Sequence, residues 1–171
     1  GYWNETSIFS DQLVRMDIGK KALKRALDRL GQEKIASGKM PMIVENKSAG
    51  NALGPLISAL NGSSIYQKQS YLIGMMGEKI GSELMTIVDD PFIVSGRGSR
   101  LFDDEGMATE KRAVVENGIL KNYYIDTYYG KKLEMEATSG STTNLVFKPG
   151  EKDLEGLLAD IDRGILVTGF N

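Results

Sequence analysis

The stretch RAVVENGILKNYYI, residues 112–125, decides the fold class of this chain. Apolar residues make up most of its two arms, 112–116 and 119–125, and the dipeptide Asn117-Gly118 separates them. Asparagine and glycine tolerate the positive φ angles of a type I′ turn, the tight turn that joins two antiparallel strands. The stretch therefore predicts a β-hairpin within an antiparallel sheet.

The rest of the chain contains further short strand patterns and separated amphipathic helices. Strand patterns occur at residues 34–36, 40–45, 84–88, 145–148 and 165–170. Helical patterns occur at residues 17–30, 49–60 and 153–160, with a helical turn at 128–133 and a mixed segment at 64–76. We expect Pro55 to kink or delimit the second helix, because proline has no N–H to donate. Separated helices with hairpin-linked strands predict an α+β fold with a largely antiparallel sheet.

The composition excludes several classes of function. Of the 171 residues, 41% are hydrophobic and 26% are charged, and the formal net charge is −2, so no overall positive field attracts nucleic acid or anionic membrane. No apolar run approaches the length of about 20 residues that a membrane-spanning helix needs. The basic residues between Lys20 and Arg29 lack interleaved aromatic residues, so we interpret them as the solvated face of an amphipathic helix. The absence of cysteine fits a reducing compartment, and we expect a cytoplasmic protein.

The chain contains neither histidine nor cysteine. It therefore has no imidazole or thiolate for a zinc site, a Ser-His-Asp triad or a Cys-His dyad. The remaining catalytic candidates are Asp103, Asp104 and Glu105, with Asp89 and Asp90 nearby in the sequence. Paired carboxylates can divide acid and base roles, or hold Mg²⁺ or Ca²⁺ through oxygen. Acidic residues before a glycine are also common in turns, and we favour that interpretation while leaving the catalytic one open.

A tyrosine cluster follows the predicted hairpin. Tyr123, Tyr124, Tyr128 and Tyr129 could line a peptide groove, since tyrosine buries a large area and keeps a polar tip. We favour the alternative, in which two of these side chains turn inward and two outward. The loop SGSTT at residues 139–143 has no histidine to activate a serine, and we predict a flexible connection there.

Three stretches together resemble a known family. They are AGNALGPLISALNGSSIYQKQSYL at 49–72, FDDEGMATEKRAVVENGILKNYYIDTYYGKKL at 102–133 and RGILVTGFN at 163–171. They are similar to the TldD/TldE (PmbA) family, once labelled modulators of DNA gyrase, and the resemblance covers most of the chain from about Gly31 onward. It implies a larger two-domain fold. Residues 1–46 would then end an N-terminal or middle region, and residues 47–171 would form part of a C-terminal domain that is cut off at its end.

The resemblance also implies a two-subunit zinc metallopeptidase that acts on unfolded or leader peptides. One subunit type, TldD, carries a His-Glu-x-x-x-His motif, in which the histidines bind zinc and the glutamate is the general base. In this chain Gly50 and Pro55 stand in place of the histidines, and Asn51 stands in place of the glutamate. This departure matches the TldE/PmbA branch, which lacks the site. We therefore expect no catalytic residue, no metal ligand and no cofactor in this chain, and zinc in a TldD-like partner subunit.

The resemblance leaves the partner and the peptide contacts as expectations. The partner would be a TldD-like metallopeptidase subunit or a second copy of the chain, with a peptide or unfolded protein as substrate and with neither nucleic acid nor membrane. The peptide-binding candidates are Asp104, Glu105, Tyr123, Tyr124 and Tyr128. Two other functions remain open: an autonomous carboxylate- or Mg²⁺-dependent hydrolase, and a DNA gyrase-associated regulator that binds DNA through residues 20–29.

Overall fold

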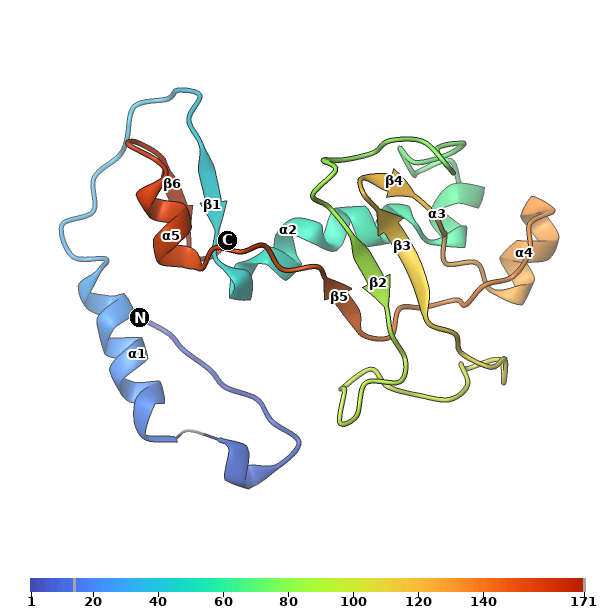
Figure 1. Ribbon diagram of the computed structural model, residues 1–171, viewed down its shortest axis with the longest axis horizontal. Coiled ribbons are helices and arrows are strands. Elements are labelled where there is room, and N and C mark those ends of the chain that lie inside the picture. The colour runs from blue at the N-terminus through green and yellow to red at the C-terminus, as the bar shows by residue number, and fades with distance from the viewer. Residues whose placement is uncertain (14, 171) are drawn as a thin grey trace. The chain divides into compact units, whose positions relative to one another are not determined.

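The computed structural model describes residues 1–13 and 15–170, with the side chains of Arg15 and Met16 left out (Figure 1). The chain divides into two compact units, Gly1–Lys39 and Met40–Asn171. Because compactness alone does not define a domain limit, the boundary predicted between residues 46 and 47 stays a prediction.

The first unit contains one short 3₁₀ helix, η1 (Ser10–Gln12), and one α-helix, α1 (Arg15–Leu27). The basic face of α1 is largely engaged within the unit. Lys21 Nζ and Arg25 Cζ lie 5.1 and 4.7 Å from the centre of the Trp3 ring, and Lys24 pairs with Asp28 at 2.9 Å. These contacts favour the interpretation as ordinary helix surface over a nucleic-acid interface.

Two sequence expectations for the first unit need correction. The helix predicted over 17–30 ends at Leu27, and Leu30 is exposed. The strand predicted at 34–36 does not form: these residues are irregular, and among the residues that the structure describes no strand pairs with them. An isolated strand has no ladder partner for its backbone groups, so a short β-branched run alone does not produce one.

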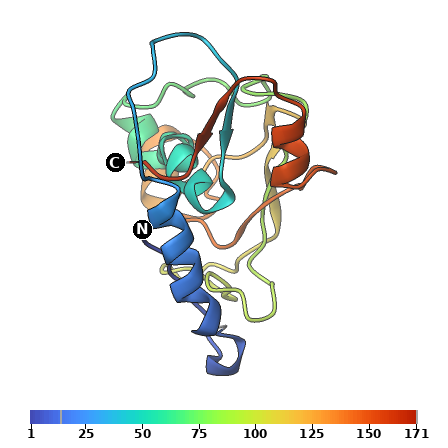
Figure 2. The ribbon, with the colours of Figure 1, turned by 90° about the vertical axis from the view of Figure 1, so that its left-hand side faces the viewer.

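The second unit is an α+β structure with two separate sheets, which confirms the predicted fold class. The elements in chain order are β1 (Met42–Val44), α2 (Asn46–Ala59), α3 (Gly62–Tyr66), β2 (Ile87–Asp89), β3 (Arg112–Glu116), β4 (Ile119–Leu120), α4 (Thr127–Leu133), β5 (Leu145–Phe147), α5 (Leu154–Ala159) and β6 (Ile165–Val167). The four-stranded sheet is entirely antiparallel with strand order β4-β3-β2-β5 (Figure 1). The parallel pair of β1 and β6, seen in front in Figure 2, forms the other sheet.

The predicted hairpin forms at β3 and β4. Asn117 and Gly118 have φ angles of 49° and 79°, the positive values that a type I′ turn requires. The second arm is shorter than expected: the Lys121 N–H donates to the Val114 carbonyl at 2.9 Å, and Asn122 then shares the same carbonyl at 3.4 Å, so regular pairing ends there. The chain then crosses to Leu60, whose carbonyl accepts the Tyr124 N–H at 2.9 Å.

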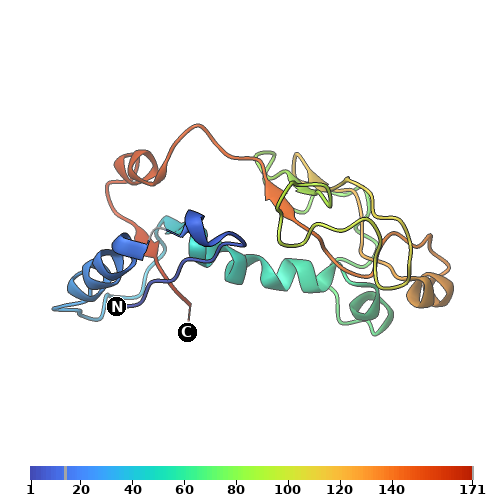
Figure 3. The same ribbon diagram turned by 90° about the horizontal axis from the view of Figure 1, so that it is seen from below.

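Helix α2 connects the two sheets, as Figure 3 shows from below. It begins at Asn46, three residues before the helical pattern predicted at 49–60. Pro55 lies inside the helix and does not delimit it. Asn51, whose carbonyl loses its N–H partner, is exposed together with Pro55, so water can hydrate the freed group.

The core lies between the C-terminal end of α2 and the four-stranded sheet. Its fully buried side chains have relative exposures below 2% and are Leu60, Ile87, Val114, Val115, Leu120 and Ile125, together with Pro91. Each buried methylene contributes about 0.8 kcal/mol, so these side chains supply much of the stabilisation of the unit. The opposite end of α2 contributes none of them.

Candidate functional site

An apolar cavity of about 750 Å³ lies along the N-terminal half of α2. Gly50, Leu53 and Ile57 line it from α2, and their spacing places them on one face of the helix. Strands β1 and β5 and helix α5 complete the wall, mainly through Ile43, Val44, Leu145, Phe147, Leu154 and Leu157. Glu45, Asn46 and Lys152 add the polar groups. The size and lining are those of a ligand or peptide side-chain site.

The residues that the family resemblance aligns with the zinc motif, Gly50, Asn51 and Pro55, lie on this helix, and the alignment itself stays a prediction. Gly50 lines the cavity, whereas Asn51 and Pro55 are exposed and do not line it. Glycine and proline side chains offer no metal ligand, and a neutral carboxamide is no general base, so these residues do not fit a zinc ion. Within residues 1–13 and 15–170, no group of three or more His, Cys, Asp or Glu side chains gathers that could hold a metal.

The acidic loop at residues 103–105 forms local contacts. The buried Asp103 accepts the backbone N–H groups of Glu105 at 2.9 Å and Met107 at 3.0 Å through one oxygen. Glu105 accepts the Thr127 N–H at 2.9 Å and the Thr127 hydroxyl at 2.5 Å, at the start of α4. Asp104 is exposed. These contacts support the interpretation of the loop as a turn that also caps a helix.

The structure separates the candidate tyrosines. Tyr123 and Tyr124 are buried in the core, where the Tyr123 hydroxyl donates to the Leu72 carbonyl. Tyr128 is exposed and stacks edge-on against the partly buried Tyr129, with ring centres 5.0 Å apart. This arrangement is close to the interpretation with two tyrosines inward and two outward. As peptide-binding residues all of the candidates stay predictions, and only Asp104, Glu105 and Tyr128 present exposed side chains.

Asp89, which the sequence placed beside the acidic candidates, is a buried carboxylate at the end of β2, and its burial was not predicted. It is only 2% exposed and accepts hydrogen bonds from the Thr143 N–H at 2.9 Å, from the Thr143 hydroxyl and from the Tyr124 hydroxyl at 3.1 Å. Burial, followed by the nearby Asp89 charge, raises the pKa of Tyr124 well above its ordinary value of 10.0. The carboxylate thus joins β2, the segment after β4 and the loop before β5.

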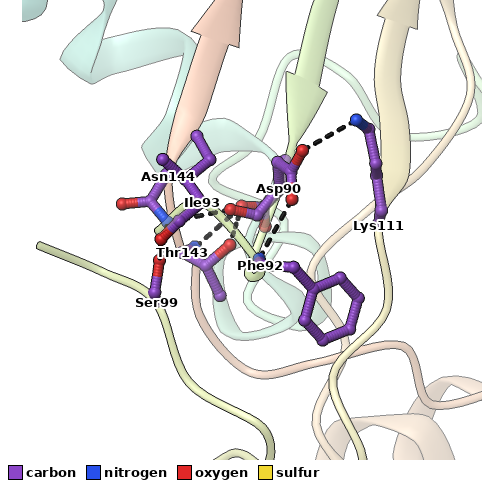
Figure 4. A network of polar contacts seen from close by, with 8 residues as sticks. Asp90, Phe92, Ile93, Ser99, Lys111, Thr143 and Asn144 are labelled. Atoms are coloured by element: carbon purple, nitrogen blue, oxygen red, sulfur yellow. Dashed lines mark hydrogen bonds and ion pairs between the residues drawn. The ribbon is translucent and has the colours of Figure 1, made fainter. Parts of the chain in front are cut away.

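A neighbouring polar network fixes the same loop (Figure 4). The Asn144 side-chain amide donates to the Asp90 carbonyl at 2.8 Å and to Ser99 Oγ at 2.9 Å, while its oxygen accepts the Gly98 N–H. Asp90 also pairs with Lys111 at 2.7 Å, and this hydrogen bond is the main cause that lowers the pKa of its carboxyl. The segment 139–143 is hydrogen-bonded to the rest of the unit, through Thr143 to Asp89 and through Ser141 and Thr142 to Arg100, and its predicted flexibility stays a prediction.

Helices in the described part of the chain are all too short or too polar to traverse a lipid bilayer.

Comparison with known proteins identifies a family. A family model described as the PmbA/TldA metallopeptidase C-terminal domain matches residues 37–171. A "Metalloprotease PmbA homolog" from Buchnera aphidicola is 35% identical over 161 residues, which cover 92% of this chain and 36% of that protein. The "Metalloprotease PmbA" of Escherichia coli O157:H7 is 31% identical over 153 residues, 88% of this chain and 34% of that protein.

Solved structures agree with this assignment. A protein from Bacteroides thetaiotaomicron that carries the name of a DNA gyrase modulator is 45% identical and superposes with a TM-score of 0.94, over 96% of this chain and 38% of that one. TldE from Thermococcus kodakarensis is 29% identical with a TM-score of 0.82, over 92% of this chain and 39% of that one. The chain thus spans between a third and two fifths of these relatives' lengths. On these matches, the chain belongs to the PmbA/TldD metallopeptidase family.

Proposed function

We propose that this chain is part of a TldE/PmbA-like subunit that has no zinc site of its own and works with a zinc-bearing TldD-like chain. The complex would hydrolyse unfolded or leader peptides. The partner would supply the zinc and the activated water, and this chain would supply walls and contacts that hold the peptide. Cytoplasmic location and assembly with that partner belong to the same proposal.

One observation supports this proposal: helix α2, which the family resemblance aligns with the zinc motif, contains neither histidine nor glutamate. In that alignment Gly50, Asn51 and Pro55 stand in place of both histidines and the glutamate, and the 171 residues contain no imidazole and no thiolate. The face of α2 that would surround the chemistry is instead apolar and lines a cavity with Leu53 and Ile57. Such a surface binds apolar side chains but cannot activate water.

The test is purification of the full-length protein from its host, followed by a peptidase assay. We expect a co-purifying chain that bears His-Glu-x-x-x-His, and hydrolysis of an unfolded polypeptide by the complex but not by either chain alone. Replacing the motif glutamate of the partner by glutamine removes the general base and should abolish hydrolysis while the complex persists. Hydrolysis by this chain alone, or its repeated recovery without such a partner, would overturn the proposal.

A further inference from the structure

The sequence contains two Asn-Gly dipeptides, Asn61-Gly62 and Asn117-Gly118, and both lie in the second unit. Asn-Gly is a dipeptide prone to spontaneous deamidation, because glycine has no side chain to hinder attack of its own nitrogen on the asparagine carboxamide. The same residues are therefore a modification site in two different structural settings. One protein allows the two settings to be compared directly.

Deamidation needs only water and hydroxide. The glycine nitrogen loses its proton to hydroxide and attacks the asparagine Cγ; the new N–Cγ bond closes a succinimide ring as the Cγ–Nδ2 bond breaks. The leaving nitrogen takes a proton from water and departs as ammonia, which regenerates the hydroxide. Water then opens the ring, either at Cγ to give aspartate or at the backbone carbonyl carbon to give isoaspartate. One water is consumed and one ammonia is released.

The fold holds both reacting groups of the first dipeptide. Asn61 Oδ1 accepts the Ser63 N–H at 2.9 Å and the Ser63 hydroxyl at 2.7 Å, and its Nδ2 donates to the Gly140 carbonyl at 3.4 Å. The Gly62 N–H donates to the Tyr124 carbonyl at 2.8 Å, and Tyr124 is only 3% exposed. Deprotonation of the Gly62 nitrogen therefore requires part of the core to open.

The second dipeptide is held through its backbone alone. The Asn117 N–H donates to Thr86 Oγ1 at 3.1 Å and the Gly118 N–H donates to the Met85 carbonyl at 2.8 Å. No hydrogen bond reaches the Asn117 carboxamide from residues 1–13 or 15–170, and the residue is exposed. Met85 and Thr86 lie in irregular chain just before β2, so a local opening of the turn breaks both bonds without unfolding the core.

We propose that Asn117 deamidates spontaneously in the folded protein, that its rate is set by the contacts of the turn with Met85 and Thr86, and that folding protects Asn61. The inference does not rest on the proposed function, because the reaction takes place within this chain and uses only water.

The two products have different consequences for the hairpin. Aspartate keeps the turn, since Asp-Gly also suits type I′ geometry. Isoaspartate lengthens the main chain by one atom where the surroundings are close: the Gly118 carbonyl accepts the Ile80 and Gly81 N–H groups at 2.8 and 3.2 Å, and a Cβ at Gly118 would lie 2.5 and 2.6 Å from the carbonyl oxygens of Gly81 and Ser82. The longer chain cannot keep both the two-residue turn and these contacts.

Peptide mapping by mass spectrometry tests the proposal on the full-length protein, aged at neutral pH. In the folded protein we expect Asn117 to convert at least tenfold faster than Asn61. In guanidinium chloride, where neither dipeptide is held, the two rates should agree within threefold. Equal rates in the folded protein would overturn the proposal, and so would an unmodified Asn117 after the time in which the unfolded protein has fully converted.

Variants at Thr86 test what sets the rate. Thr86→Val removes the hydroxyl that accepts the Asn117 N–H, and should speed deamidation of Asn117 at least threefold while Asn61 stays unchanged. Thr86→Ser is the matched control, because it keeps the hydroxyl and should leave both rates within twofold of their original values. An unchanged Asn117 rate in Thr86→Val would overturn the role assigned to the contact with Thr86.

Asn117→Asp separates the effect of isoaspartate from that of the added charge. This variant carries the aspartate product from the start, and its urea midpoint should stay close to that of the fresh protein. Aged protein that contains isoaspartate at position 117, detected by enzymatic methylation of isoaspartyl groups, should unfold at a lower urea concentration. Identical midpoints of the isoaspartyl protein and Asn117→Asp would overturn the predicted damage to the hairpin.

Discussion

The two edge strands of the antiparallel sheet, β4 and β5, both consist of apolar residues, but they differ in what lies beside them. At β4 the chain returns over the edge through residues 77–81, and Leu120 is completely buried. At β5 the inner side is fixed by Asp89 and Asn144, whereas no strand lies beside the outer side among residues 1–13 and 15–170, and Leu145 and Phe147 line an apolar cavity. The open edge is therefore not a loose part of the molecule. Hydrogen bonds of Asp89 and Asn144 hold the residues just before β5 in place, so the position of the strand is fixed.

The largest expected difference is between equivalent truncations in the two edge strands. Leu120→Ala should lower the free energy of unfolding by about 3 kcal/mol, because it leaves a cavity in a closed core. Leu145→Ala removes the same atoms from a side chain that is only partly buried, and should cost about 1 kcal/mol. Urea unfolding of the two variants measures both values.

Equal losses of unfolding free energy in the two variants would contradict the expected difference between the two edge strands. They would mean that Leu145 is as closely packed in solution as Leu120, and hence that something already covers the β5 edge. The slope of the free energy against urea concentration should be unchanged, which confirms that the denatured state is the same in both variants.

A smaller effect is expected at the residue that fixes the inner side of β5. Asp89→Asn keeps the shape but removes the charge that accepts hydrogen bonds from Thr143 and Tyr124, and should cost about 2 kcal/mol. Asp104→Asn is the matched control, since Asp104 is exposed and should change stability by less than about 0.5 kcal/mol. Urea unfolding at pH 7 compares them.

Exchange of the Val146 amide shows whether this loss is local. If Asp89 positions β5, Asp89→Asn should speed the exchange of Val146 more than that of Val114 in β3. A uniform acceleration of both amides would indicate that the carboxylate stabilises the unit as a whole and has no particular role at the open edge.

Local signals explain what the sequence could predict. The Asn117-Gly118 turn and the β-branched arms fix the hairpin, and Asp153 caps α5 by accepting the Gly156 N–H at 2.8 Å. Both depend on residues within a few positions of one another. The α+β class followed from these elements, and the family resemblance from longer stretches.

Contacts between residues far apart in the chain explain the features that the sequence could not predict. The parallel pairing of Met42 with Ile165 joins segments far apart in the chain, and no local pattern specifies it. Asp89 could not be distinguished from turn residues, because its partners Tyr124 and Thr143 meet it only in the folded chain. The same holds for the cavity, whose lining comes from α2, β1, β5 and α5.

The smallest effect concerns Tyr124, a buried residue whose hydroxyl donates a hydrogen bond to the Asp89 carboxylate. Its raised pKa means that the folded state keeps the hydroxyl protonated where the unfolded chain, with a pKa near 10.0, loses its proton. The stability from this group is full below about pH 10 and is lost as the pH rises toward the folded pKa, by about 1.4 kcal/mol per pH unit. Tyr124→Phe should cost about 1 kcal/mol at pH 8, from the lost hydrogen bond to Asp89. The deficit should shrink to about zero near pH 11, because phenylalanine has no proton to lose. Urea unfolding of both proteins from pH 8 to pH 11 measures this convergence.

A deficit that stays constant over this range would mean that Tyr124 titrates alike in the folded and unfolded states. The Asp89 side of the sheet would then be as open to water as the β5 edge, and the contrast between the two regions would disappear.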